Sequence, residues 1–538
     1  MLRDRRNFWL ILVFSLIVPG VFWGLPSALT PQVDAPLPLG PLLFFAELKK
    51  SDLNTTYPAF HQILVLPFYA IAFVVYWLAG GISKISSAWP YGMRDVSSFF
   101  SVLIVISNLI AAAMGTLLLW CTFPFVEKER KWLLFCLLFM GTNGTFIYYA
   151  RTSNLDIPYN FWLALTWLFL WHYLIEDRPI LRSLVPAGIA AACAVGSKDQ
   201  AAGMIVGTGL LLLLIGPQHS TALSQRMRQT ALFGAVVAVA YAVVAIVPQP
   251  ARWWNHARFV VSPHAPTKIP LSAAGEIDIL GVTLGRLLAV FTWPVLALCI
   301  LGIVVLFRSG RARQFWLLSL PMIGYYVVII GMTRVAYPRF MIPFVFAVVV
   351  LATHGVAFIG GRLAARSGAQ LAWTALLAAF LIYRFAFSYL PVTYAQVFDL
   401  KRDVTRDLSS FVSPGNSLLI SHMQSYEYPN ADIYDRYRLM RLPHEPIIPA
   451  SRHTASIFHP LDLNVEFYLL GTGTAGLPSN TPVPSMPLQG ELIKQWRYPD
   501  WVRNSVLVPC IFEFALYRRT EPLPLDYVPP VYITSGLQ

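Results

Sequence analysis

Asp34 is an acidic residue in a stretch of mostly apolar residues and prolines that runs from Leu29 to Gly40. A carboxyl group partly shielded from water in such surroundings suits a general base, because it can take a proton from a hydroxyl group held against it. The alternative is a structural role, in which Asp34 caps a helix that begins near Pro41. Asp34 is therefore a candidate for proton transfer, with the helix cap left open.

Two further acidic positions stand beside apolar runs. Asp156 follows Arg151 by five residues and Pro158 then opens an apolar run, which fits an N-terminal helix cap as well as a functional role. Lys198 and Asp199 lie between two apolar segments, where charges are costly unless they are paired or reached by water. The structural alternative for these two residues is an ion pair with other buried charges.

The composition indicates that a lipid bilayer is the solvent for much of the chain. Of 538 residues, 56% are hydrophobic and 12% are charged, and the mean hydropathy is +0.58. A soluble domain has about 25% charged residues, so this chain cannot cover its surface with polar groups. The net charge of +13 forms no stripe that would bind nucleic acid. The five cysteines show no CxxC or Cys/His pattern, so neither a disulfide framework nor a zinc site is predicted.

About eleven apolar runs are predicted to span the membrane as helices, because backbone polar groups in lipid must be satisfied within their own segment. The first follows a basic N-terminus and leads into a proline-rich segment, so we expect a retained helix rather than a cleaved signal peptide. The fifth and sixth could be one long helix broken at Lys198. The predicted spans are 8–25, 97–121, 132–149, 159–176, 184–197, 199–216, 230–248, 284–307, 314–331, 339–360 and 371–390.

Another apolar run, residues 59–80, is predicted to lie at the outer interface or to enter the bilayer only partway. If it does not cross, and the N-terminus with its three arginines is cytoplasmic, every inside connector is basic, as the positive-inside rule requires. The C-terminus is then outside an integral membrane protein, which we expect in the plasma (inner) membrane. The inside connectors contain Lys128, Arg130, Lys131, Arg178, Arg182, Arg226, Arg228, Arg308, Arg311, Arg313, Arg362 and Arg366.

The predicted fold class is a polytopic α-helical membrane protein with a C-terminal soluble α/β domain outside the cytoplasm. Residues 1–391 hold the spans and a long first outer loop at 26–96, and residues 392–538 form the outer domain. A helix near 394–412 leads into that domain. Its short β-prone runs, separated by prolines and glycines, are Ser417–Ile420, Val465–Leu470, Ser505–Val508 and Phe512–Tyr517.

This topology places basic residues at the outer ends of the spans, where the positive-inside rule gives them no role. A negatively charged ligand at the outer leaflet would explain them, because Arg offers a fork of donors that matches phosphate and Lys offers a point charge. The alternative for any one of them is a side chain that reaches to lipid headgroups. The candidate phosphate-binding residues are Arg94, Arg151, Lys198, Arg258 and Arg339.

The order of these features resembles the GT-C type glycosyltransferases, in the protein-mannosyltransferase and aminoarabinose-transferase branch. Thr56–His61 is similar to that family's Tyr-Pro-Pro segment, Gly188–Lys198 to its Gly-rich helix ending in Lys, and Tyr337–Pro343 to its Arg-Tyr-Leu-Leu-Pro signature. The resemblance covers nearly the whole chain in layout. Many members have Asp-Glu in the first loop, whereas Ala35 follows Asp34 here, and the paired prolines are reduced to Pro58-Ala59.

The resemblance implies a hexosyl or pentosyl transferase at the outer membrane face. The donor would be a polyprenyl-phosphate sugar, and the acceptor a lipid-linked glycan, a lipid or a protein hydroxyl. Transfer with inversion needs one carboxylate base, for which Asp34 is the candidate, with Asp156 orienting the acceptor or a basic residue. The five basic residues would stabilise the leaving phosphate. No cofactor and no metal are expected, with a metal held by Asp34 and Asp156 as the alternative, and the partners are membrane lipids rather than nucleic acid.

A different glycan enzyme, such as an oligosaccharide ligase, remains an alternative, although its usual very large outer loop is not matched by the modest loop at about 249–283. Two other classes of protein also remain alternatives. A transporter often shows inverted repeats and helices broken in both halves, and this sequence contains no repeat. A lipid-binding or scaffold membrane protein without catalysis would not depend on an acid in the first loop. Loss of sugar transfer on replacing Asp34 would separate a transferase from both.

Overall fold

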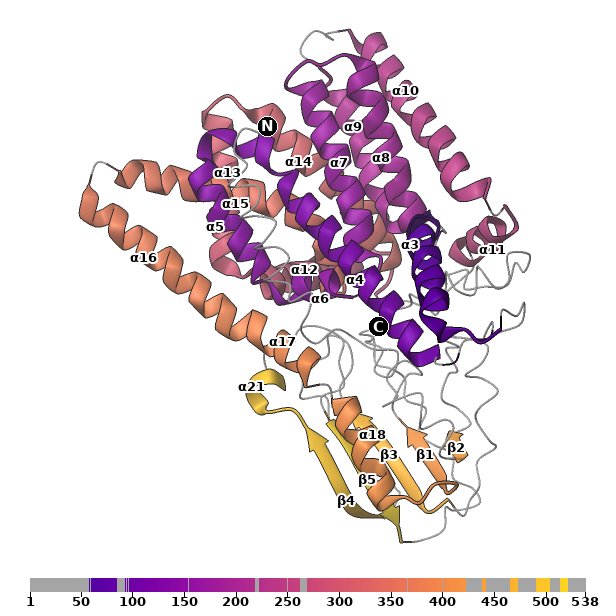
Figure 1. Ribbon diagram of the computed structural model, residues 1–538. Helices are drawn as coiled ribbons and strands as arrows, with labels where there is room; N and C mark the ends of the chain where they lie inside the picture. Colours follow the sequence, from indigo (N-terminus) through magenta and orange to yellow (C-terminus); the bar gives the residue numbers. More distant parts are fainter. Residues whose placement is uncertain are drawn as a thin grey trace.

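A bundle of helices and a five-stranded sheet domain make up the part of the chain that the computed structural model describes (Figure 1). Asp34, the predicted span at 8–25 and the β-prone run Ser505–Val508 lie outside the described residues. The described residues are 58, 60–84, 92, 94, 96–152, 154–217, 222–248, 250–261, 269–364, 366–398, 400–421, 438–441, 465–472, 490–503 and 513–520.

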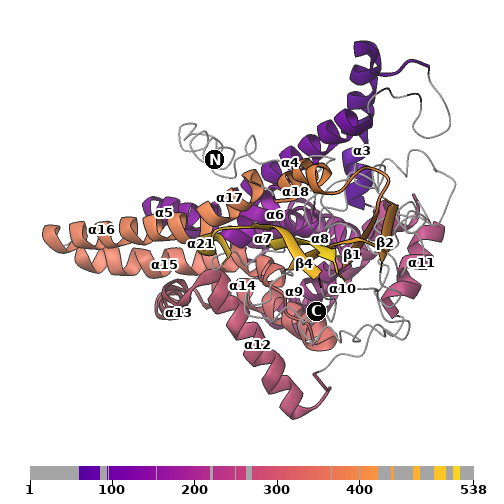
Figure 2. The same cartoon turned by 90° about the horizontal axis from the view of Figure 1, so that it is seen from below.

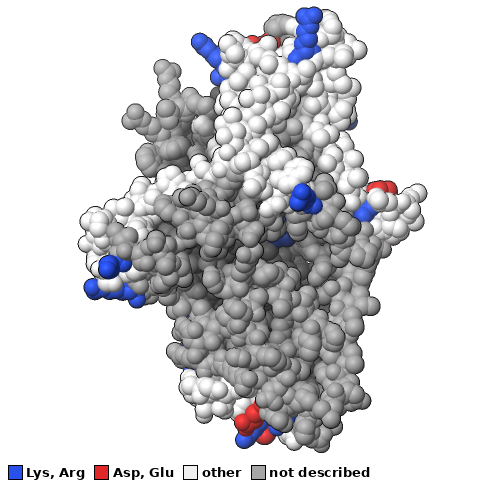
Figure 3. Space-filling model, turned by 90° about the vertical axis from the view of Figure 1, so that its right-hand side faces the viewer, with Lys and Arg blue, Asp and Glu red and all other residues white. Residues whose placement is uncertain are grey.

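The helix bundle supplies most of the apolar surface of the molecule. On the face shown in Figure 3 the described atoms of the bundle are almost all uncharged, and the Lys and Arg atoms lie mainly at its ends. Its main helices are α3 (Phe60–Tyr76), α4 (Val96–Trp120), α5 (Arg130–Gly141), α6 (Gly144–Ala150), α7 (Asp156–Leu174), α8 (Leu184–Ser197), α9 (Ala202–Leu214), α10 (Leu223–Tyr241), α11 (Pro250–Val261), α12 (Ala273–Phe291), α13 (Trp293–Arg308), α14 (Ala312–Tyr325), α15 (Val345–Leu363) and α16 (Ser367–Arg384).

The protein is a polytopic helical membrane protein. Among the described residues, seven helices are long and apolar enough to cross a bilayer, and an eighth is added if the bent pair α12 and α13 is one span. Every predicted span after the first coincides with a helix or a pair of helices. Fewer helices meet this length and hydropathy requirement than the number of spans predicted from the sequence. One reason is that residues 132–149 form the two short helices α5 and α6, and another is that α9 is itself short. Helix α7 is buried on nearly all sides, so its surface need not match lipid.

Helices α9 and α14 cross with their backbones in contact. A Cβ atom added at Gly207 would lie 2.2 Å from the carbonyl oxygen of Leu320, and one added at Gly324 would lie 2.5 Å from that of Gly203. Gly203 and Gly207 are four residues apart on α9, which is the small-residue spacing that lets membrane helices approach closely. This crossing sets the position of Tyr325, the last residue of α14.

The predicted span at 284–307 is wrong in one respect, because the chain bends by 103° between α12 and α13. Thr292, at the junction, has a φ of 68°, a left-handed conformation. The Val290 carbonyl near the end of α12 accepts hydrogen bonds from Asn143 Nδ2 at 2.7 Å and Arg384 Nη2 at 3.3 Å. These side chains satisfy a backbone group that a break in the helix leaves exposed. Figure 2 shows α12 extending away from the bundle.

Helix α3 and the π-helical turn η1 (Trp77–Gly81) form the segment predicted not to cross the bilayer. By length and hydropathy alone the segment could span. Both of its ends contact residues expected at the outer face: Phe60 lies against Gly196, and the Gly81 carbonyl accepts a hydrogen bond from the Arg94 backbone at 2.8 Å. The position of the segment relative to the bilayer stays a prediction.

The sheet domain has the strand order β2-β1-β3-β5-β4, with β2, β1 and β3 parallel and β5 antiparallel to both of its neighbours. The helix near 394–412 corresponds to α17 (Leu390–Val397) and α18 (Leu400–Phe411), and α18 packs on β4 and β5 (Figure 1). Three predicted β-runs are confirmed as β1, β3 and β5, while β2 and β4 were not predicted. The strands are β1 (Ser417–Ser421), β2 (Arg438–Arg441), β3 (Phe467–Thr472), β4 (Gly490–Arg497) and β5 (Glu513–Arg519).

Asp407 on α18 links this helix to the sheet, and its contribution to stability depends on pH. The Trp496 indole N–H donates to its carboxylate at 3.1 Å and, with Arg406 on the other side, holds the pKa of Asp407 below its usual value despite partial burial. A carboxyl group with a lowered pKa stabilises the folded state fully above the usual pKa of 3.8, and this stabilisation is lost as the pH falls through the lowered value.

We therefore expect Asp407→Asn to destabilise the sheet domain at neutral pH and to remove part of its sensitivity to acid. Thermal unfolding followed by tryptophan fluorescence, from neutral pH to below about pH 3, measures both effects. Asp403→Asn is the control, because Asp403 is on the same helix and pairs with Arg406 at an exposed position. Equal acid sensitivity in wild type and Asp407→Asn would contradict this account of Asp407.

Candidate functional site

A buried ion pair joins two residues that the sequence singled out separately. Lys198 Nζ lies 2.7 Å from Asp156 Oδ1, and the two side chains are 1% and 0% exposed. Asp156 is the first residue of α7, and Lys198 follows the last residue of α8. The structural alternative considered for Lys198, a pairing with another buried charge, is therefore present in the structure.

The ends of the two helices explain why these charges are tolerated there. The N-terminus of a helix favours a negative group and the C-terminus favours a positive one, so Asp156 and Lys198 each occupy the end that stabilises its charge. A local hydrogen bond stabilises the loop before Asp156, since Asn154 Oδ1 accepts from the Asp156 backbone N–H at 2.9 Å. Asn160 Nδ2 in turn donates to the Asp156 carbonyl at 2.7 Å.

Only one oxygen of the Asp156 carboxylate is occupied by a described residue. Oδ2 is buried and has no hydrogen-bond partner among the described residues. Lys198 Nζ lies 5.6 Å from the centre of the Tyr159 ring. The hydroxyl groups of Tyr159 and Tyr325 interact with each other, and Asp156 lies close enough to influence both of them electrostatically. A carboxylate and two hydroxyls that retain bonding capacity can receive a polar ligand or water.

The two tyrosines were missed by sequence reasoning. Tyr159 follows Asp156 by three residues on the same helix, so the spacing of an α-helix places both on one face. That spacing was a usable signal. Tyr325 comes from α14, at the crossing with α9, and no local pattern connects it to Asp156.

Arg339 approaches the same region from the 3-10 helix η7 (Pro338–Phe344), which contains most of the predicted signature Tyr337–Pro343. Its guanidinium lies over the rings of Tyr337 and Phe340, at 5.4 and 5.9 Å. Helix η7 packs against α6 and α7, and Arg339 interacts electrostatically with Tyr325. The structure therefore brings Arg339, Lys198 and Asp156 to one end of the bundle.

Arg151 is placed differently. Its side chain is buried, Nη1 donates to Thr393 Oγ1 at 3.0 Å, and the guanidinium lies 5.1 Å from the centre of the Tyr389 ring. Both contacts come from the segment that leads to the sheet domain. The role of Arg151 as a phosphate ligand stays a prediction, and its described contacts are with protein groups.

Arg94 and Arg258 lie at exposed positions nearer the edge of the bundle. Arg94 precedes α4, and Arg258 on α11 stacks over the ring of Trp254 at 5.2 Å. Helix α11 is tied to the residue after Lys198, because His256 Nε2 lies 3.9 Å from Asp199 Oδ2. Within the residues that the structure describes, no three His, Cys, Asp or Glu side chains gather in a way that could hold a metal ion.

No protein-family model and no curated protein matches the sequence. Among solved structures, the chain is similar to ArnT from Cupriavidus metallidurans in the apo state, with a TM-score of 0.48 and 14% identity over 95% of this chain and 97% of that chain. The structure of the same protein bound to undecaprenyl phosphate gives a TM-score of 0.45 at the same identity and coverage. Arabinofuranosyltransferase AftD from Mycobacteria gives 0.46 and 14% identity, over 96% of this chain and 40% of that chain. Likenesses this remote assign no role to any residue here.

Proposed function

We propose that this protein is a membrane glycosyltransferase that moves a sugar from a polyprenyl-phosphate donor to a glycan, lipid or protein acceptor at the outer face, with inversion. The observation that supports this most is the buried pair of Asp156 and Lys198, with one carboxylate oxygen left without a described partner beside the hydroxyl groups of Tyr159 and Tyr325. A fully buried ion pair contributes little to the stability of the fold, because the cost of desolvating the two charges offsets much of their attraction. Its presence beside groups that can still bind a polar ligand is better explained by chemistry.

The reaction requires removal of the proton from the acceptor hydroxyl and, at the same time, stabilisation of the negative charge on the leaving phosphate. The acceptor hydroxyl attacks the anomeric carbon of the sugar while the bond from that carbon to the phosphate oxygen breaks. The hydroxyl proton passes to a carboxylate, and the leaving polyprenyl phosphate keeps the electron pair and gains negative charge. We propose Asp34 as the base and Lys198 and Arg339 as the groups that stabilise the leaving phosphate.

The remaining candidates have supporting roles in this proposal. Asp156 orients Lys198 and the acceptor, and Arg94 and Arg258 attract the anionic donor from positions nearer the edge. Arg151 is the weakest of the predicted phosphate ligands, because Thr393 and Tyr389 already engage its guanidinium. We also propose that the sheet domain, within residues 392–538, lies outside the cytoplasm.

We expect Asp34→Asn to lower kcat for sugar transfer by about 100- to 10,000-fold, the usual effect of a general base, while KM for the donor changes little. The measurement uses the full chain purified in detergent, short-chain polyprenyl-phosphate sugars and extracted lipid glycans. Asp52→Asn is the matched control, because it makes the same change in the same outer loop.

The outcomes separate the candidate functions. Undiminished transfer by Asp34→Asn would move the base elsewhere, with Asp156 next. A wild-type protein that transfers no sugar from any donor would favour the transporter or a lipid-binding protein without catalysis.

A further inference from the structure

Helix α17 lies between the helix bundle and the sheet domain and contacts both (Figure 1). It is eight residues long and follows directly from α16 through the π-helical turn η8 (Phe385–Tyr389). Such a short element has little stability of its own, so the contacts on its two sides decide its position.

On the bundle side, α17 and η8 are fastened to both ends of α6. The Gly144 backbone N–H, at the start of α6, donates to Ser388 Oγ at 2.8 Å. A Cβ atom added at Gly144 would lie only 2.9 Å from the Ser388 carbonyl oxygen, so the two segments meet closely here. Arg151, directly after α6, donates to Thr393 and lies over Tyr389.

On the sheet side, two aromatic residues that follow β4 hold α17. The Tyr498 hydroxyl donates to the Ala395 carbonyl at 2.9 Å and accepts from the Leu400 backbone N–H at 3.3 Å. It therefore joins the end of α17 to the start of α18. The Trp501 ring, on the short helix α21 (Asp500–Arg503), packs edge-on against Tyr394 with centroids 5.1 Å apart.

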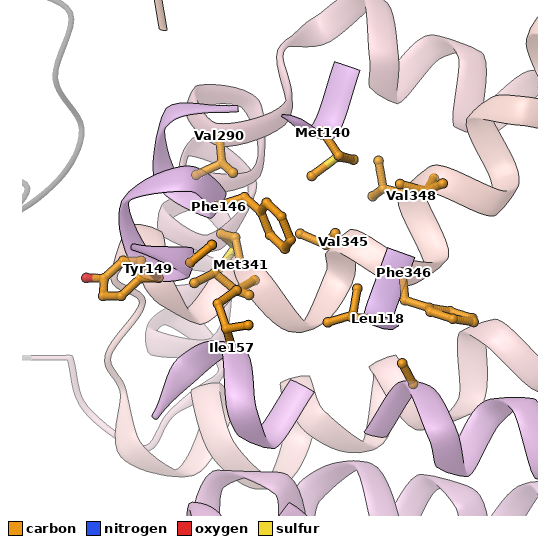
Figure 4. Close-up of a cluster of buried hydrophobic side chains, with 14 of the residues drawn as sticks. Leu118, Met140, Phe146, Tyr149, Ile157, Val290, Met341, Val345, Phe346 and Val348 are labelled. Carbon is orange, nitrogen blue, oxygen red and sulfur yellow. The ribbon is translucent and has the colours of Figure 1, made fainter. Parts of the chain in front are cut away.

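The described residues on both sides of Arg151, in α6 and in the short segment that leads to Asp156, are buried. All seven residues of α6 are buried, and Figure 4 shows Phe146 pointing into the hydrophobic cluster while the Tyr149 hydroxyl points away from it. Thr152 and Asn154 are also buried, and their side chains bond to the Tyr149 carbonyl and the Asp156 backbone N–H. Tightly packed elements transmit a shift rather than deform.

We propose that the sheet domain positions Asp156 through α17 and Arg151. Arg151 is then a positioning residue that acts on the ion pair with Lys198 and not a ligand of the donor. The coupling itself is a property of the fold, and its effect on transfer rests on the proposed function.

Hydrogen exchange of the full chain in detergent tests the coupling without any substrate. Tyr498→Phe removes one hydroxyl and both of its bonds to α17 and α18. We expect the backbone amides of residues 151–156 to exchange about two- to fivefold faster, which corresponds to the loss of about one hydrogen bond of net stabilisation. Tyr517→Phe is the matched control, because it makes the same change in the same domain, on strand β5, where Tyr517 stacks on Tyr468. It should leave these amides unchanged.

Combining Tyr498→Phe with Arg151→Met tests the path. Since either change breaks the same connection, the double variant should exchange at 151–156 little faster than the faster single variant. Additive effects, or exchange at 151–156 that is unchanged in Tyr498→Phe, would overturn the proposal.

The same variants in the transfer assay show the effect on function. Tyr498→Phe should lower kcat by about two- to tenfold, because Asp156 is less well positioned, and should leave KM for the donor unchanged. The loss of a residue that binds the donor would raise KM instead. A raised KM at normal kcat contradicts positioning. If wild type transfers no sugar, the proposed function fails, while the exchange result still decides whether the sheet domain is coupled to Asp156.

Discussion

Replacing either member of the Asp156 and Lys198 pair should destabilise the protein, and replacing both should restore stability without restoring sugar transfer. Asp156→Asn or Lys198→Met leaves a buried charge without its partner, which costs about 3–5 kcal/mol. The double variant Asp156→Leu/Lys198→Met carries neither charge, so its stability should return to within about 1–2 kcal/mol of wild type or exceed it.

Activity should follow a different order from stability. If Lys198 stabilises the leaving phosphate, all three variants should lose at least about 100-fold in kcat, the usual effect of removing one such group. Thermal unfolding in detergent and the transfer assay, performed on the same preparations, measure the two quantities.

Glu176→Gln is a suitable control for this pair. Glu176 follows α7 at its other end, near the surface, where its carboxylate pairs with Arg178 and contacts Trp171 Nε1 and His172 Nδ1. Ion pairs at the surface contribute about 1 kcal/mol or less, so its replacement should lower stability far less than Asp156→Asn and should leave transfer unchanged. A double variant that is as stable as wild type and as active would show that the buried pair has no part in the reaction.

The second large effect is expected at the crossing of α9 and α14. Gly207→Ala places a Cβ 2.2 Å from the Leu320 carbonyl oxygen, closer than any real contact, so the helices must separate. We expect a loss of at least about 1–3 kcal/mol, as for an overpacked core, and a fall in the temperature of unfolding. Transfer should also fall, because Tyr325 ends α14 beside this crossing.

Gly209→Ala supplies the comparison on the same helix. A Cβ at Gly209 meets only a Thr230 methyl at 4.0 Å, and alanine is the better helix former, so this change should be neutral or slightly stabilising. Equal unfolding temperatures for Gly207→Ala and Gly209→Ala would mean that α9 and α14 are not held in contact.

The helical part of the fold was largely predictable because its signal is local. Each span after the first appears in the sequence as an apolar run. Such a run forms a helix in lipid, because its backbone polar groups must be hydrogen-bonded within the segment. Strand β4 escaped prediction because Glu491, Lys494 and Gln495 interrupt its apolar pattern, as an edge strand permits. The bend at Thr292 also escaped, because the groups that stabilise it come from Asn143 and Arg384, far away in the sequence.

The candidate site was predictable as residues but not as an arrangement. Asp156 and Lys198 each stood out as a charge beside apolar runs, yet no local pattern pairs two residues that are 42 positions apart. Arg151 stood out for its charge, whereas its contacts depend on Thr393, 242 residues later. The packing of segments that are distant in the sequence determines these partners, and no local sequence pattern indicates which segments pack together.

The bend between α12 and α13 has a consequence for the order in which the chain assembles. During synthesis α12 and α13 emerge as one nearly continuous apolar stretch before α16 exists, and Arg384 on α16 is 94 residues beyond Val290, whose carbonyl it binds. Until that arginine is synthesised, Asn143 is the one of these two hydrogen-bond donors that is present. We therefore expect the nascent chain to pass through an early state in which this stretch is straight, and to reach its mature angle only after α16 has entered the bilayer and docked beside α5.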